Sequence, residues 1–141
     1  MVILDDHLLR DWLATSDAGL DASIGGESLA TTNLWYARLC KSASTASGGA
    51  LVGSWGTEQR QALMASLVAL PEEFTIVPMH SLAWQMGYLR TEHRGLSTLG
   101  AEAVAAAQAL DARLLVSARD DGPGIRACCV ALGIGYEALA R

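Results

Sequence analysis

Short apolar runs alternate along the chain with longer stretches in which apolar residues recur every three or four positions. The run Val2–Leu4 stops at Asp5–Asp6, and the run Leu114–Val116 is followed closely by Asp120–Asp121. Apolar runs of this length with polar boundaries are typical of buried strands in a parallel sheet. The stretches with the longer period are typical of helices that cover such a sheet on one face.

Helix caps, glycines and prolines set the expected boundaries of these elements. The predicted strands are Val2–Leu4, Phe74–Val77, Arg113–Val116 and Ile134–Leu139. The predicted helices are His7–Ala14, Leu29–Ser42, Thr57–Leu70, Pro78–Glu92, Ser97–Leu110 and Pro123–Leu132, the last closed by Gly133. Two segments rich in Ser and Gly, 15–27 and 42–56, are predicted loops, the second with a short ordered piece around Ala50–Val52. This alternation predicts an α/β fold, a three-layer α/β/α sandwich with a mainly parallel central sheet.

Carboxylates follow two of the predicted strands at the edge where open α/β sheets bind their ligands. If these strands are neighbours, Asp5 and the Asp120–Asp121 pair form one acidic pocket, which suits Mg²⁺ because this ion prefers carboxylate and water oxygens. Asp6 is predicted to cap the following helix. For Asp120–Asp121 an ordinary strand-to-helix turn is an equal alternative. Glu102, one turn into the alanine-rich helix, either points to this edge or only complements the helix dipole.

Length and charge narrow the functional classes. The chain has 141 residues, of which 51% are hydrophobic, so we expect a single domain over residues 1–141 with a substantial core. The net charge of −5 disfavours a free-standing nucleic-acid binder, which normally has a basic surface. It is compatible with a nuclease whose metal ion links its acids to a phosphate, and it is also compatible with a basic protein partner.

Cysteine usage and hydropathy indicate a cytoplasmic protein that does not cross a membrane. The cysteines have no spacing typical of a disulfide framework or a zinc site, and we expect reduced thiols at Cys40, Cys128 and Cys129. No apolar stretch approaches the roughly 20 residues that span a bilayer. Trp55, in the second predicted loop, is expected to be exposed. The apolar composition and the tryptophans also predict a homodimer formed through a helix face.

Several segments resemble the PIN-domain family. The resemblance is carried by the opening segment Val2–Leu9 and by four segments of the last third, Leu96–Ala107, Ala112–Ser117, Gly124–Ala127 and Leu132–Ile134. It covers the two ends of the chain, whereas the middle agrees only in the order of elements. The resemblance implies an α/β/α nuclease fold, and many PIN domains are ribonuclease toxins paired with a small basic antitoxin. It also implies a cluster of acids around Mg²⁺ or Mn²⁺.

Only part of that acidic cluster is matched. Asp5 matches the first acid of the family, and Asp120 or Asp121 matches the acid that follows the last core strand. The segment 31–36, where a helix-borne Glu is expected, contains no acid. The remaining acid falls on Gly100, and Glu102 lies two residues on, about 200° around the helix.

Three interpretations remain open. The first is a PIN-like domain of toxin–antitoxin type, whose degenerate metal site acts mainly by binding. The second is an active ribonuclease that depends on Mg²⁺ or Mn²⁺ and cleaves RNA. Its predicted catalytic residues are Asp5, Glu102, Asp120 and Asp121, with Asp5, Asp120 and Asp121 as metal ligands. The third is an unrelated small α/β ligand-binding module.

Overall fold

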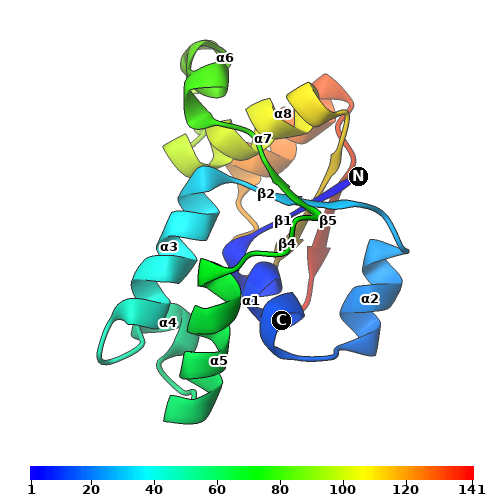
Figure 1. The fold of residues 1–141 in the computed structure, drawn as a ribbon. Helices are drawn as coiled ribbons and strands as arrows, with labels where there is room; N and C mark the ends of the chain where they lie inside the picture. Colours follow the sequence, from blue (N-terminus) through cyan, green and yellow to red (C-terminus); the bar gives the residue numbers. More distant parts are fainter.

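A five-stranded parallel sheet with helices on both faces forms the molecule, as the computed structural model of all 141 residues shows (Figure 1). The strands are β1 (Val2–Leu4), β2 (Leu29–Thr31), β3 (Phe74–Ile76), β4 (Arg113–Ser117) and β5 (Tyr136–Leu139). The helices are α1 (Asp6–Ala14), α2 (Ala18–Ile24), α3 (Asn33–Ser44), α4 (Gly49–Val52), α5 (Thr57–Val68), α6 (Met79–Glu92), α7 (Thr98–Leu110) and α8 (Pro123–Leu132). The predicted three-layer α/β/α class is therefore confirmed.

The strand order is β3–β2–β1–β4–β5, with every neighbouring pair parallel. The first predicted strand therefore lies in the centre of the sheet. Ile3 pairs with Ala30 on one side and with Leu114 on the other. Because the carboxyl ends of parallel strands share one edge, the segments after β1 and β4 meet there, as the sequence predicted.

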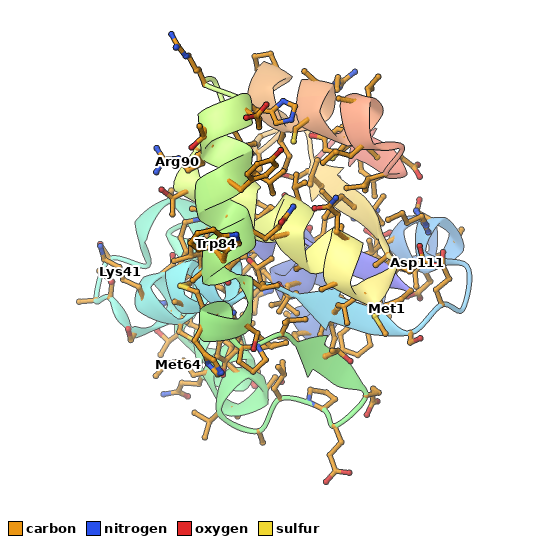
Figure 2. The ribbon with its side chains drawn as sticks, turned by 90° about the horizontal axis from the view of Figure 1, so that it is seen from above. Met1, Lys41, Met64, Trp84, Arg90 and Asp111 are labelled. Carbon is orange, nitrogen blue, oxygen red and sulfur yellow. The ribbon has the colours of Figure 1, made fainter.

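Alternation along β1 divides the core into two layers. Ile3 packs into the cluster formed with α6, α7 and α8, whereas Val2 and Leu4 pack into the cluster formed with α1 and α5. Helix α7 is buried almost all round, and its alanines allow α6, α8 and the sheet to approach closely. Helix α6 lies outermost on this side, and its Trp84 is 90% exposed (Figure 2).

Two boundaries differ from the sequence prediction. The prediction of a helix that begins at Leu29 is wrong. Residues 29–31 form β2, which lies between β1 and β3, and α3 begins only at Asn33. The apolar positions of this short strand continue into those of α3, so the helical period hides it. The predicted loop 15–27 contains α2, which Asp17 caps and Gly25 ends in a left-handed conformation (φ 66°).

Smaller predictions have mixed outcomes. The short ordered piece in the second loop is confirmed as α4, and Gly133 ends α8 with φ 68°. The prediction that Trp55 is exposed is wrong, because its ring is half-buried and the Arg10 guanidinium lies 5.3 Å from its centroid. All three cysteines are free. None of the helices combines the length and apolar character that crossing a membrane requires.

Candidate functional site

Asp5 caps α1 and fastens it to the neighbouring strand. Its Oδ1 accepts a hydrogen bond from the Leu8 amide at 2.8 Å, and its Oδ2 accepts one from the Ser117 amide at 2.7 Å. The predicted capping role of Asp6 is therefore wrong, because the preceding residue performs it. The Asp5 carboxyl is fully buried, and this burial raises its pKa to about 7 despite the two amide hydrogen bonds.

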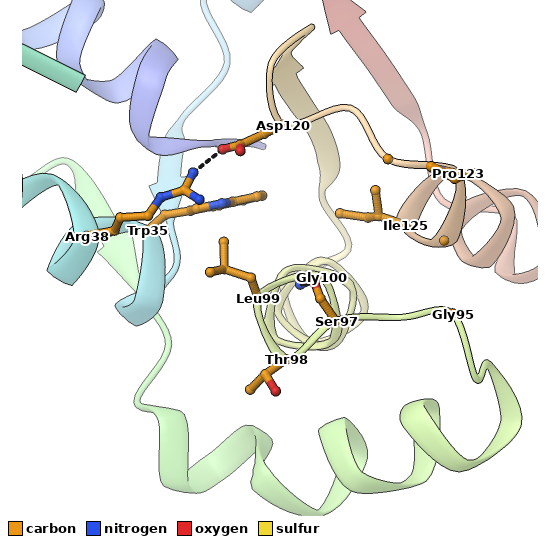
Figure 3. Close-up of a pocket in the computed structure, with 12 residues that line it drawn as sticks. Trp35, Arg38, Gly95, Ser97, Thr98, Leu99, Gly100, Asp120, Pro123 and Ile125 are labelled. Atoms are coloured by element: carbon orange, nitrogen blue, oxygen red, sulfur yellow. Dashed lines mark hydrogen bonds and ion pairs between the residues drawn. The ribbon is translucent and has the colours of Figure 1, made fainter. Parts of the chain in front are cut away.

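Asp6 and Asp120 meet at one guanidinium. Asp6, in the first turn of α1, is fully buried and accepts hydrogen bonds from Nε and Nη2 of Arg38, the latter at 2.6 Å. Nη2 of Arg38 also donates to Asp120 (Figure 3). Such a fork on carboxylates is the strong, directional form of ion pair. Hydrogen bonding to Asp6 raises the pKa of Arg38, so this side chain stays cationic.

Asp120 is the less buried of the two carboxylates. Burial raises its pKa first, and the negative charge of Asp6 raises it further, whereas Arg38 opposes both effects. The imidazole of His7 lies beside them, and one potential ligand atom from each of Asp6, His7 and Asp120 falls within 4.8 Å of the others. Burial lowers the pKa of His7, which favours the neutral ring. These side chains and Arg38 are called the Arg38 cluster below.

The other two predicted site residues, Asp121 and Glu102, make no hydrogen bonds to the Arg38 cluster. Asp121 accepts from Arg126 and from the Tyr136 hydroxyl at 2.9 Å, so it ties α8 to β5, and Arg126 lowers its pKa. Glu102 is fully buried in α7 and accepts from the first amides of α3 and from the Asn33 side chain, at 2.7–2.9 Å. It thereby holds the start of α3 against α7. The structure therefore brings Asp5 and Asp120 to one edge but gives Glu102 and Asp121 other partners.

A cavity of about 490 Å³ opens beside the Arg38 cluster. Its walls come from α3, from the first turn of α7 and from the turn that leads from β4 into α8 (Figure 3). The lining residues include Trp35 and Arg38 of α3, Ser97–Gly100, Asp120 and Gly122–Ile125. The cavity thus lies at the carboxyl edge of the sheet, where α/β folds place their ligands.

The chain matches no protein-family model and none of the curated proteins. Among solved structures it is similar to a chain of a toxin–antitoxin complex from Klebsiella pneumoniae, with a TM-score of 0.57 and 19% sequence identity. The similarity covers 89% of this chain and 92% of that one. At this identity the similarity establishes a shared fold.

The residues at this edge do not fit a magnesium or manganese site as they are arranged. Such a site needs free carboxylate oxygens and room for water. Here the guanidinium of Arg38 already lies between Asp6 and Asp120, and both oxygens of Asp5 accept from main-chain amides. The catalytic and metal-binding roles of Asp5, Glu102, Asp120 and Asp121 stay predictions.

Arg38 is the residue at this edge that sequence reasoning missed. Its position in α3 follows Trp35 by three residues and precedes Leu39, so it lies on the apolar side of the helix. A charged residue on such a face needs a partner of opposite charge. That signal was present in the sequence, but it could not show that the partners would be Asp6 and Asp120.

Proposed function

We propose that this chain is a PIN-like domain of toxin–antitoxin type, whose site at the carboxyl edge acts by binding and not by metal-dependent cleavage. The observation that carries the proposal is the Arg38 guanidinium between Asp6 and Asp120. This side chain supplies, as a fixed part of the protein, the positive charge that these two carboxylates require.

The energetics of the Arg38 cluster support this proposal. A divalent cation would have to displace Arg38, and with it three hydrogen bonds to carboxylate oxygens. These hydrogen bonds join charged groups and are among the strong ones, so the incoming ion would have to offset their loss. Mg²⁺ also gives up its own water reluctantly. Binding to two carboxylates alone would not compensate the ion for these losses.

A small basic antitoxin is the proposed protein partner. The similar structure is itself a toxin–antitoxin complex, and the present chain carries a net charge of −5. Opposite net charges accelerate association and favour the correct partner over others. Self-association into a homodimer is also proposed, and light scattering on the purified protein tests it directly.

The decisive experiment compares RNA cleavage by the wild-type protein in Mn²⁺ and in EDTA. We expect the same background in both, because Arg38 lies between the two carboxylates that a metal ion would need. Metal-dependent cleavage that disappears in Asp120→Asn would contradict the proposal and establish the alternative of an active ribonuclease. The close approach of ligand atoms from Asp6, His7 and Asp120 is the observation that favours this alternative.

A pair of variants at Arg38 tests whether this side chain is what excludes the metal. Arg38→Glu places a third carboxylate beside Asp6 and Asp120, so we expect Mn²⁺ to bind and to raise the melting temperature of this variant. Arg38→Gln has a similar length but no charge and is the matched control, for which we expect a much smaller rise. If Mn²⁺ stabilises the wild type as much as Arg38→Glu, Arg38 does not exclude it.

A further inference from the structure

Helix α8 presents uncapped main-chain donors to the cavity beside the Arg38 cluster. Its N-cap residue, Gly122, has no side chain, and the amides of Gly124 and Ile125 have no acceptor within the protein. All three residues line the cavity. The first amides of a helix carry partial positive charge and attract anions.

The start of α7 adds donors to the same space. The hydroxyl of Ser97 accepts only from the Gly100 amide, and the amides of Thr98 and Leu99 have no acceptor within the protein. Figure 3 looks nearly along the axis of α7, with Leu99 and Gly100 at the cavity. The free amides of two helices therefore lie around one cavity.

Glycines allow these two helix starts to approach each other. A Cβ added at Gly124 would collide with the carbonyl oxygen of Gly95, in the segment that leads into α7. A Cβ at Gly100 would lie 2.9 Å from Cδ1 of Leu96 and 3.6 Å from Cβ of Ile125. A side chain at Gly124 would therefore push the start of α8 away from the segment that leads into α7, whereas Gly100 is in ordinary contact with α8.

An independent observation comes from the Trp35 indole. This side chain is only 2% exposed, and its Nε1 has no hydrogen-bond partner. The ring extends from α3 into the cavity, between the guanidinium of Arg38 and Leu99 (Figure 3). Buried N–H groups without an acceptor are rare in folded proteins, so this donor points to a ligand that supplies one.

We propose that this cavity is a metal-independent binding site for the phosphate group of a small phosphate monoester, such as a nucleoside monophosphate. The free amides of α7 and α8, Trp35 and Arg38 are the donors for the phosphate oxygens. The volume of about 490 Å³ falls within the range of small-molecule sites. Ile125 and Leu99 form apolar walls for the rest of the ligand.

Asp120 determines which phosphate compounds bind. Its carboxylate lines the cavity and repels the phosphate anion, but it accepts a hydrogen bond from a sugar hydroxyl in the organic part of a phosphate ester, which inorganic phosphate lacks. Esters of hydroxyl compounds are therefore preferred over inorganic phosphate. This proposal rests on the proposed function in that the site works by binding, and the experiment below is run in EDTA so that metal-dependent cleavage plays no part.

The test uses the indole N–H signals of the four tryptophans in ¹⁵N-labelled protein, with the Trp35 signal assigned from Trp35→Phe. Inorganic phosphate, ribose 5-phosphate and adenosine monophosphate are titrated separately. We expect the Trp35 signal to shift and saturate, with at least tenfold tighter binding of the esters. No shift with any of the three overturns the site. Equal binding of inorganic phosphate overturns the assignment to an ester.

Gly122→Asp blocks the site without endangering the fold. Gly122 has φ −122°, and a Cβ there would have its nearest contact at 4.0 Å, so the new carboxylate can cap α8 and take the amides from the ligand. Gly56→Asp makes the same change at the uncapped start of α5, away from the cavity, and is the matched control. We expect at least a tenfold loss of ester binding in Gly122→Asp alone, with an unchanged or higher melting temperature. Wild-type affinity in that variant overturns the proposal.

Discussion

The Asp5–Asp6 pair and the Asp120–Asp121 pair have the same sequence but use it in different environments. Asp5 and Asp6 are both fully buried, whereas Asp120 and Asp121 are half-buried. In each pair one carboxylate joins elements of the fold and the other binds Arg38. The Asp5 carboxyl accepts hydrogen bonds from main-chain amides, whereas the Asp121 carboxylate accepts them from side chains near the surface.

The position of each pair in its turn explains the division. Asp5 directly joins β1 to α1, so its side chain has the geometry of a helix cap and Asp6 is turned toward α3. Asp120 follows the end of β4 by three residues, in a turn that lets it reach the same guanidinium. Adjacent identical residues therefore need not share a role, and a strand-end acid is not always a ligand.

The largest expected effect comes from removing the cation that unites the two pairs. Arg38→Ala leaves Asp6 fully buried without its partner, so we expect the free energy of unfolding at about pH 7 to fall by about 2–3 kcal/mol. This expected loss of stability is smaller than the loss for a fully buried ion pair, because the Arg38 side chain is 38% exposed. Urea denaturation followed by circular dichroism measures it.

The matching control first removes the two carboxylates that Arg38 neutralises. In the background Asp6→Asn/Asp120→Asn, Arg38→Ala should lower the free energy of unfolding by less than about 1 kcal/mol, since no carboxylate is left unpaired. An equal loss in both backgrounds would mean that Arg38 stabilises the fold through packing of its methylene groups and not through its charge.

How far the sequence predicts this molecule depends on the range of the interaction. The runs Val2–Leu4 and Leu114–Val116 identify central strands because full burial on both faces leaves only apolar residues. Gly133 and the first turn of α7 follow local capping rules, which a sequence displays directly. β2 was missed because its apolar positions continue into those of α3, so that the two elements together look like one helix.

The candidate site is predictable only in its location. Strand-end acids indicated the correct edge of the sheet, because parallel strands end together. They could not indicate Arg38, whose partners Asp6 and Asp120 lie 32 and 82 positions away in the sequence. Nor could they show that Glu102 turns to the start of α3, since that contact depends on how α7 packs against it.

The next comparison removes the structural member of each pair. Asp5→Ala loses the cap of α1 and leaves the Ser117 amide without its acceptor, so we expect a loss of about 2 kcal/mol at about pH 5. Asp121→Ala removes an ion pair at the surface and one hydroxyl hydrogen bond, and we expect a loss below about 1 kcal/mol. Equal losses in thermal or urea unfolding would contradict the distinction between the pairs.

The last expected effect, small for each unit of pH, is a pH dependence that belongs to Asp5 alone. Its pKa is raised by burial from 3.8 to about 7, so the unfolded chain releases this proton at lower pH than the folded protein does. Ionisation of Asp5 therefore lowers stability as the pH rises from about 4 to about 7, by about 1 kcal/mol per pH unit. The stability advantage of the wild type over Asp5→Ala should shrink across this range, as urea unfolding at several pH values would show. A constant difference would mean that the capping amides keep the carboxylate ionised. In that case the titration of the Asp5 carboxyl carbon, followed by ¹³C NMR, would have its midpoint well below 7.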